Sequence, residues 1–329
     1  MQRELLEIVE RFPGRRVLLV GDFMLDRYVF GDAERISPEA PVPVLRVRER
    51  QDRVGGAGSV ALNLAALGAQ VACFGLLGRD RFGEQVTASL AEAGAATDGL
   101  VRADDRPTIT KTRLVGLAEH RHRQQILRVD DEIVQPPTEA DARRLIDAVR
   151  AAVARADVVC LEDYAKGVLS PDVCEAIVAA ARAAGKPVLV DPARGGGWEK
   201  YRGATCVTPN LRELQEIAQS EGLRGRDLPE ICEALCQKYD FRFMLVTLGP
   251  EGMYLHHPEL KRRFPARALE VYDVSGAGDT VVATLTTFYA AGLPLAQVVE
   301  LANRAAGIVV GKVGTQPILL SELEKSLKN

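Results

Sequence analysis

Glycines and a carboxylate stand together in YDVSGAGDT, residues 272–280, directly before an apolar run typical of a helix. Backbone N–H groups at a helix start lack partners within the helix and carry the positive end of its dipole, so Gly276, Ala277 and Gly278 would attract an anion. Asp279 would repel a resting phosphate, but it could take the proton from a hydroxyl that attacks phosphorus. The pattern predicts phosphoryl transfer with Asp279 as the base. An ordinary glycine-rich turn is the alternative.

A second glycine cluster, Gly55, Gly56 and Gly58, opens another helix and would allow a ligand to approach the backbone. Its letters, GAGSVA, also fit a dinucleotide-binding fingerprint. That fingerprint requires a buried strand before the glycines, whereas VLRVRERQDR is basic and exposed in character. The segment GIVVGKV has no Ser or Thr after Lys312, so a Walker A loop is not expected either.

Asn210 and Glu213 lie three residues apart in TPNLRE, on one face of the first turn of an expected helix. Their oxygen atoms suit Mg²⁺ bound through water, or the positioning of a phosphate. The same two residues would also make an ordinary capping box. The spacing leaves both interpretations open.

Alternating strand and helix patterns over the C-terminal two thirds predict a mainly parallel sheet with helices on both faces. Segments 41–50 and 108–130 instead alternate apolar with polar or basic residues, which is typical of a sheet with one wet face. We expect one domain over residues 1–329, with a small β-sheet lid formed by segments at roughly 23–54 and 106–130.

Composition excludes several classes of protein. The chain has 329 residues and a formal net charge of −3, which gives no sign of a nucleic-acid or membrane partner. Its apolar runs are shorter than the ~18 residues of a membrane span, and its first residues lack the apolar core of a signal peptide, so a cytoplasmic protein is expected. Six cysteines without a C-x-x-C pair predict buried thiols rather than a zinc or disulfide role.

Taken together, these motifs resemble the ribokinase-like, PfkB-type family of sugar kinases over nearly the whole chain. The first family motif is similar to Gly55-Gly56 through Gly68 and Gly78, and the second to Asp273 through Asp279 and on to Ala283. TLGPEG and ANRAAGIVVGKVGTQP resemble the nucleotide-binding segments. Within the family, GDFMLDRY, RISPEAPVPVL, RQQILRVD and EDYAKGVLS resemble the kinases of D-glycero-β-D-manno-heptose 7-phosphate.

The resemblance implies a three-layer α/β/α fold with a β-sheet lid, and transfer of phosphate from ATP to the anomeric O1 of that heptose phosphate. This step would belong to ADP-heptose biosynthesis for the lipopolysaccharide core. Mg²⁺ is the implied cofactor, with K⁺ added in some relatives. A homodimer formed through the lid is expected, and so is a stand-alone kinase without a nucleotidyltransferase half. A kinase for another sugar or sugar phosphate is the main alternative, and a non-catalytic binding protein on the same scaffold is a weaker one.

The resemblance also implies residue roles. Asp279 would activate O1, beside an anion hole of Gly276, Ala277 and Gly278. ATP and Mg²⁺ would be served by Asn210, Glu213, Thr247, Gly249, Gly252 and Asn303, with Glu213 reaching Mg²⁺ through water. Sugar hydroxyls would be held by Asp22, Gly55, Gly56, Ser59 and Asn63. A monovalent cation would lie at Asp273, Ser275, Val309 and Gly314.

Two details qualify these roles. Ser59 stands where the family motif has Asn, so its sugar contact would be lost, bridged by water or supplied by Asn63. The substrate's 7-phosphate needs basic partners, and the candidates are Arg27, Arg35, Lys111, Arg113 and Lys166. Lys166 is favoured because it follows a strand exit. Asp26 is expected to cap a turn or to pair with an arginine rather than to bind sugar.

Overall fold

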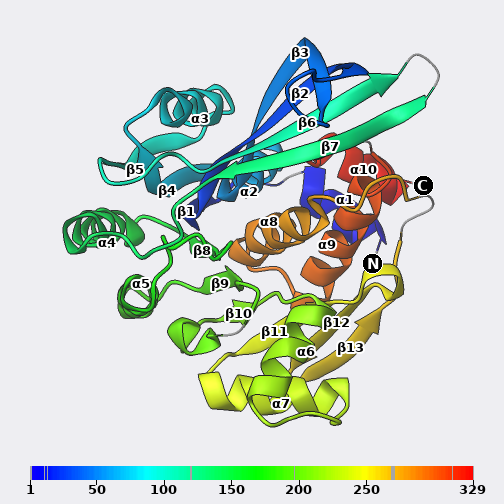
Figure 1. Ribbon diagram of the computed structural model, residues 1–329. Helices are drawn as coiled ribbons and strands as arrows, with labels where there is room; N and C mark the ends of the chain where they lie inside the picture. Colours follow the sequence, from blue (N-terminus) through cyan, green and yellow to red (C-terminus); the bar gives the residue numbers. More distant parts are fainter. Residues whose placement is uncertain are drawn as a thin grey trace.

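The computed structural model describes residues 2–10, 12, 14–118, 121–195, 197–267, 271–312 and 314–328. Its main sheet has nine strands in the order β13-β12-β11-β10-β9-β8-β1-β4-β5 (Figure 1). Their bounds are β1 (Arg16–Gly21), β4 (Gln70–Gly78), β5 (Ala96–Ala103), β8 (Val158–Glu162), β9 (Val188–Asp191), β10 (Cys206–Val207), β11 (Phe243–Thr247), β12 (Met253–His257) and β13 (Leu260–Phe264). The seven strands from β11 to β5 in this order run parallel to their neighbours.

Helices cover both faces of this sheet. One face packs against α1 (Gln2–Glu10), α2 (Ala57–Ala66), α3 (Arg81–Glu92), α8 (Ala277–Ala290), α9 (Leu295–Val309) and α10 (Leu320–Lys328). The other packs against α4 (Glu139–Val153), α5 (Pro171–Ala183), α6 (Leu211–Ser220) and α7 (Leu228–Tyr239). Successive strand residues point to opposite faces, so Leu18 and Leu19 of β1 join different cores. The three-layer α/β/α fold is confirmed.

A second sheet of four strands, which we call the lid sheet, lies above one end of the main sheet (Figure 1). Its order is β3-β2-β6-β7, and the strands are β2 (Phe23–Ile36), β3 (Pro43–Gly56), β6 (Thr110–Ala118) and β7 (Arg121–Asp131). Only Asp22 separates β1 from β2, so the chain passes directly from the buried sheet into the lid sheet. The period-2 segments of the sequence therefore lie in β3, β6 and β7.

Two features of the fold were not anticipated. Residues 23–36 form a single long strand, although their sequence does not alternate. Strands β12 and β13 run antiparallel at the edge of the main sheet, after a 3-10 turn at Gly249–Glu251 and a connection at 258–259. Both connections are too short for the crossover that a parallel strand needs.

Two expectations from composition can be compared with the structure. All six cysteines are buried and unpaired, as expected. None of the helices in the described part of the chain is both long and apolar enough to cross a bilayer.

Candidate functional site

Asp279 lies in the first turn of α8, almost fully buried. Gly276 is the N-cap of this helix and has φ +78°, a left-handed conformation that favours glycine. The Tyr164 hydroxyl donates to Asp279 Oδ1 at 2.8 Å, and a hydrogen bond with the Ser59 hydroxyl also lowers the carboxyl's pKa. Burial is the larger influence, and it leaves the pKa of Asp279 above its ordinary value.

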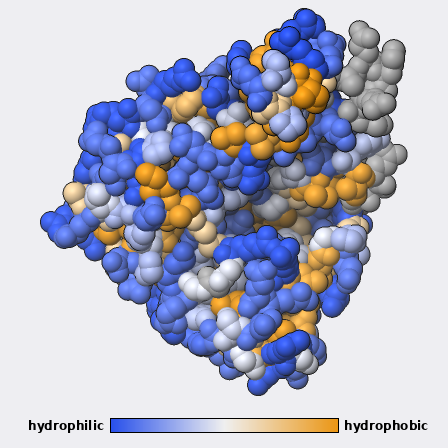
Figure 2. All heavy atoms as spheres, in the orientation of Figure 1, coloured by the Kyte–Doolittle hydropathy of each residue, from blue (hydrophilic) through white to orange (hydrophobic). Residues whose placement is uncertain are grey.

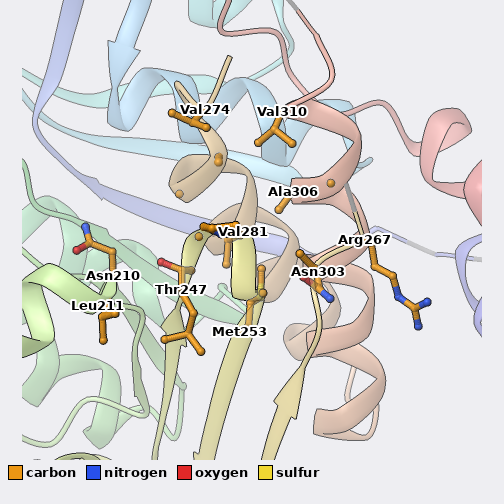
Figure 3. A pocket seen from close by; sticks show the side chains of 18 of the residues that line it. Asn210, Leu211, Thr247, Met253, Arg267, Val274, Val281, Asn303, Ala306 and Val310 are labelled. Carbon is orange, nitrogen blue, oxygen red and sulfur yellow. The ribbon is translucent and has the colours of Figure 1, made fainter. Parts of the chain in front are cut away.

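A large cavity of about 730 Å³ adjoins the start of α8. Ala277 and Gly278 line it, together with five of the six residues expected along ATP and Mg²⁺: Asn210, Thr247, Gly249, Gly252 and Asn303. Figure 3 shows these walls, with Asn210 and Thr247 on one side and Asn303, Ala306 and Val310 on the other. Apolar side chains such as Val281 and Met253 lie between them, as is usual in a ligand pocket.

The backbone around this cavity leaves room for a ligand at the helix start. A Cβ atom at Gly278 would meet only Asp191 Oδ2, at 3.9 Å, so the surface beside the first-turn amides is open. Asn303 is buried, and its side chain donates to the carbonyl of Pro265 at 2.7 Å. It therefore fixes the segment that follows β13 at the cavity wall.

Asn210 and Glu213 form a complete capping box at the start of α6, as one of the two interpretations predicts. Asn210 Oδ1 accepts from the Glu213 amide, and Glu213 Oε2 accepts from the Asn210 amide, both at 2.9 Å. Glu213 is not among the residues that line the cavity, although Asn210 is. Burial raises the pKa of Glu213.

The oxygen atoms around the cavity fit a magnesium ion that is held mainly by water and substrate phosphates. Across the residues that the structure describes, His, Cys, Asp and Glu side chains form no group of three or more suited to hold a metal ion. Mg²⁺ commonly keeps several waters and is bound through one or two protein oxygens plus substrate phosphates. Asn210 and Glu213, at the cavity's edge, offer oxygens of that kind.

Asp22 makes hydrogen bonds within the protein. It is fully buried, and its carboxylate accepts from the amides of Tyr164, Lys166 and Val168 at 2.9, 3.0 and 3.2 Å. Burial raises its pKa to about 6, although these three hydrogen bonds oppose the change. Because its carboxylate accepts from three backbone amides, Asp22 fixes the loop after β8. Its expected contact with sugar hydroxyls stays a prediction.

Asn63, one possible substitute for the family Asn that Ser59 replaces, makes hydrogen bonds within the protein. Asn63 is buried; its amide donates to the Ser59 carbonyl at 2.9 Å, and its oxygen accepts from Thr280 and from the Ile318 amide. It ties α2 to α8 and the C-terminal segment, and its expected contact with the sugar stays a prediction. Ser59 itself lies against Asp279.

The glycines at the end of β3 allow close packing at the root of the lid sheet. A Cβ at Gly55 would overlap the carboxylate of Asp26, and one at Gly56 would overlap the carbonyl oxygen of Asp22. Gly56 also has φ +58° and is the N-cap of α2. These two glycines let β2, β3 and α2 meet beside Asp279.

Basic residues from two elements gather near Tyr164. The Lys111 ammonium of β6 lies 5.5 Å from the centre of the Tyr164 ring, and burial lowers its pKa. Lys166 pairs with Glu132 at 2.7 Å and is close enough to Lys111 for their charges to repel. Arg113 pairs with Asp26 at 2.6 Å, the arginine partner predicted for Asp26.

The other two basic candidates lie elsewhere. Arg35 is exposed near the distal end of β2, nine residues beyond Asp26 and thus roughly 30 Å along the strand at ~3.3 Å per residue. The structure therefore does not bring Arg35 to Asp279. Arg27 pairs with Asp52 at 3.1 Å and stacks on the Phe82 ring.

The segments expected at a monovalent cation lie side by side. Asp273 accepts from the amides of Ser275 and Gly314, at 2.9 and 3.2 Å. The amide of Asp273 also donates to the Val310 carbonyl. The turn before α8 is thereby joined to the segment after α9, although no cation role follows from this contact alone.

Sequence reasoning missed a pair of neighbouring acids, of which Glu162 is buried and Asp191 is half-buried. Glu162 and Asp191 are register partners at the ends of β8 and β9, and their carboxyl groups interact electrostatically. Burial raises the pKa of Asp191 to about 8 and that of Glu162 well above its ordinary value. Tyr164 was missed as well. The available signal was position, since all three residues stand at or just beyond strand ends, where ligands bind in open α/β sheets.

Comparisons with known proteins identify the family of this chain. The model of the pfkB family of carbohydrate kinases matches residues 15–322. The D-beta-D-heptose 7-phosphate kinase of Bordetella bronchiseptica is 48% identical over 95% of this chain and 96% of its own. The bifunctional protein HldE of Pseudomonas aeruginosa is 46% identical over 97% of this chain, which spans 65% of that relative's length.

Solved structures show the same fold. The ribokinase of Arabidopsis thaliana, complexed with ribose and ATP, matches with a TM-score of 0.73 and 21% identity, over 96% of this chain and 99% of that one. Phosphofructokinase-2 of Escherichia coli, in complex with potassium, matches with a TM-score of 0.76 and 20% identity, over 96% and 100% of the two chains. By its family model and its relatives, the chain belongs to the pfkB family of carbohydrate kinases.

Proposed function

We propose that this kinase transfers the γ-phosphoryl group of ATP to the anomeric O1 of D-glycero-β-D-manno-heptose 7-phosphate, giving the 1,7-bisphosphate. The observation that carries the proposal is the position of Asp279, at the start of α8 between the large cavity and the basic residues under the lid sheet. Two relatives named for heptose 7-phosphate kinase or HldE, which resemble this chain over most of its length, support the choice of substrate.

Asp279 acts as the general base. Its carboxylate takes the proton from the O1 hydroxyl while O1 forms a bond to the γ-phosphorus, and the bond from that phosphorus to the bridging oxygen of ADP breaks. The proton remains on Asp279 until it passes to solvent. Backbone amides at Gly276, Ala277 and Gly278 stabilise the negative charge on the transferred group.

ATP occupies the large cavity. The adenine ring lies against the apolar wall of the cavity, and the phosphates point toward the start of α8. Asn210 and Glu213 would hold Mg²⁺ through water, and the ion would neutralise charge on the phosphates. The turn around Asp273 and Ser275 is the proposed place for a monovalent cation.

The 7-phosphate is recognised by Lys111 and Lys166. Their ammonium groups come from the lid sheet and from the loop after β8, and they lie close enough to repel each other. A dianion between them relieves that repulsion and forms charge-assisted hydrogen bonds. Lys111 has no carboxylate at salt-bridge distance in the described part of the chain, so its charge is available to a ligand.

The lid sheet closes over the sugar and also carries the proposed dimer contact. Figure 2 shows orange, apolar surface at the top of the molecule, where Figure 1 places the lid sheet. The exposed large apolar side chains of its strands include Ile36, Val47, Ile126, Leu127 and Val129. Exposed apolar strands are commonly covered by another chain. We therefore propose a single kinase domain over residues 1–329 that pairs through its lid sheet and works in the cytoplasm, where ATP is available.

The substitution Asp279→Asn tests the assigned base. We expect kcat to fall by about 10²- to 10⁴-fold, because a positioned base contributes that much, while ATP still binds. Asp227→Asn is the matched control, because Asp227 caps α7 and Asn caps a helix equally well. Turnover of Asp279→Asn close to that of the control would remove the base and with it the proposed reaction.

A panel of acceptors tests the substrate. The kinase is assayed with ATP and Mg²⁺ by release of ADP, on the heptose 7-phosphate, the unphosphorylated heptose, fructose 6-phosphate and ribose. The heptose 7-phosphate should have the highest kcat/KM. If fructose 6-phosphate or ribose exceeds it, the enzyme is a pfkB kinase for another sugar.

A further inference from the structure

The hydrogen bonds around Asp279 assign a task to two hydroxyl groups. We infer that Tyr164 and Ser59 are positioning residues that keep the Asp279 carboxylate ionised and oriented toward the acceptor sugar. The inference rests on the proposed function, in which Asp279 is the base. It goes further, because it gives Ser59 and Tyr164 a role other than contact with the sugar.

Acidic groups surround Asp279 and disfavour its charged form. Asp26 lies on β2, Glu162 ends β8 and Asp191 ends β9, and each interacts electrostatically with the Asp279 carboxyl. Tyr164, from the loop after β8, is the other titratable group facing it. Since burial also disfavours a charge, these acids and burial together raise the pKa of Asp279, and only hydrogen-bond donors oppose them.

Two of these donors are hydroxyl groups. The Tyr164 hydroxyl donates to Oδ1 at 2.8 Å, and the Ser59 hydroxyl, in the first turn of α2, lies close enough to the same carboxyl to lower its pKa. Hydrogen bonds to the charged form stabilise it. A carboxylate has about four acceptor positions, so two donors leave room for the hydroxyl of an acceptor sugar. The donors also limit rotation of the carboxyl group.

The Tyr164 side chain is fixed from behind by the loop that carries it. Asp22 accepts from the amides of Tyr164, Lys166 and Val168, which closes the loop around one buried carboxylate. Ala165 has φ +56°, an uncommon conformation for a residue other than glycine. Strain of this kind persists only where the surroundings determine the backbone firmly.

The Tyr164 ring also reaches the lid sheet, because the Lys111 ammonium lies 5.5 Å from its centre. One residue thus contacts both the base and a basic group proposed to bind the sugar phosphate. Tyr164 does not line the large cavity, so its loss should not affect ATP directly.

The test compares Tyr164→Phe with the wild type across pH. Loss of one hydrogen bond to a carboxylate raises its pKa, so the acid limb of the profile of kcat/KM for the sugar phosphate should move to higher pH by about one to two units. The plateau value of kcat should fall about tenfold as the carboxyl loses its orientation. The KM for ATP should be unchanged.

Tyr239→Phe is the matched control, because its hydroxyl also donates to a carboxylate, Glu221, but far from the base. Ser59→Ala is the second variant, and it should move the acid limb in the same direction as Tyr164→Phe. Thermal unfolding of each variant shows that it is folded. If the acid limb and the plateau kcat of Tyr164→Phe and Ser59→Ala both coincide with those of Tyr239→Phe, the inference is overturned. Full turnover by Asp279→Asn would instead overturn the proposed function.

Discussion

We predict that the acid pair Glu162 and Asp191 makes the folded state sensitive to alkaline pH. The two residues face each other across β8 and β9, and Asp191 Oδ1 also accepts from the Thr208 hydroxyl at 2.8 Å. No N–H or O–H group in the described part of the chain donates to the buried Oε2 of Glu162. We predict that a proton held between the two carboxyl groups supplies the hydrogen bond that this oxygen lacks.

The sign and size of the effect follow from the pKa of Asp191. That pKa is about 8 in the folded state, against ~3.9 in an unfolded chain. Between these values the native state binds a proton that the unfolded state has released, so the free energy of unfolding falls by at most ~1.4 kcal/mol per pH unit as pH rises. The full interval gives an upper bound of ~6 kcal/mol, and since Asp191 is partly exposed, solvent screening lowers it. We expect a loss of about 2 kcal/mol between pH 6 and 8.5.

Asp191→Asn should remove most of this dependence. An Asn side chain can accept from Thr208 through its oxygen and donate to Glu162 through its amide, as the protonated acid does. The measurement is urea unfolding of the wild type, Asp191→Asn and Asp227→Asn at about pH 6 and about pH 8.5. Asp191→Asn should lose less stability than the other two. If all three proteins lose the same amount, the acid pair does not share a proton.

Two further substitutions test the root of the lid sheet and the phosphate site. Gly56→Ala should destabilise the fold by about 2–4 kcal/mol, because Gly56 has φ +58° and the added Cβ would overlap the Asp22 carbonyl oxygen. The control Gly185→Ala should cost less, because Gly185 has a similar φ of +66° but no atom within 4 Å of the added Cβ. Equal melting temperatures of the two variants would contradict the steric argument. Lys166→Met should raise the KM for the heptose phosphate about tenfold or more and leave the KM for ATP unchanged. The control Lys261→Met loses a similar ion pair, with Glu233, and should change neither KM value. An unaltered KM for the heptose phosphate in Lys166→Met would exclude Lys166 from the phosphate site.

The main sheet could be predicted from the sequence because its parallel strands are covered on both faces. Leu18 and Leu19 are buried on opposite faces of the sheet, so the strand is a continuous apolar run, which is typical of a parallel strand. Strand β2 gives no such signal, since its burial changes along its length as it leaves the core for the lid sheet. The antiparallel edge strands β12 and β13 depend on short turns, and apolar runs do not show the direction of a strand.

The site shows the same limit at the level of single residues. Residue type and place in the motif pointed to Asp22 and Asn63, but neither reveals whether a polar atom faces a ligand or the backbone. Asp22 is enclosed by three amides of a loop about 140 residues away in sequence, and Asn63 by groups near the C-terminus. These partners are set by tertiary packing. Of the residues that line the large cavity, Gly278 and Asn210 were found from their helix-start patterns. The family resemblance alone pointed to Thr247, Gly249, Gly252 and Asn303.

For the proposed chemistry to work, Asp279 must be ionised while the neighbouring pair of acids keeps a proton. Glu162, Asp191 and Asp279 lie close together beside the start of α8, where the phosphates of ATP are proposed to bind. Three ionised carboxylates there would repel the nucleotide. Burial and mutual proximity keep a proton on the pair Glu162–Asp191, whereas hydroxyl donors favour the ionised form of Asp279. Different surroundings thus separate the pKa values of neighbouring acids, which is how a site obtains a base beside neutral groups at one pH. Ser59 and Tyr164 would then matter to the reaction without touching either substrate.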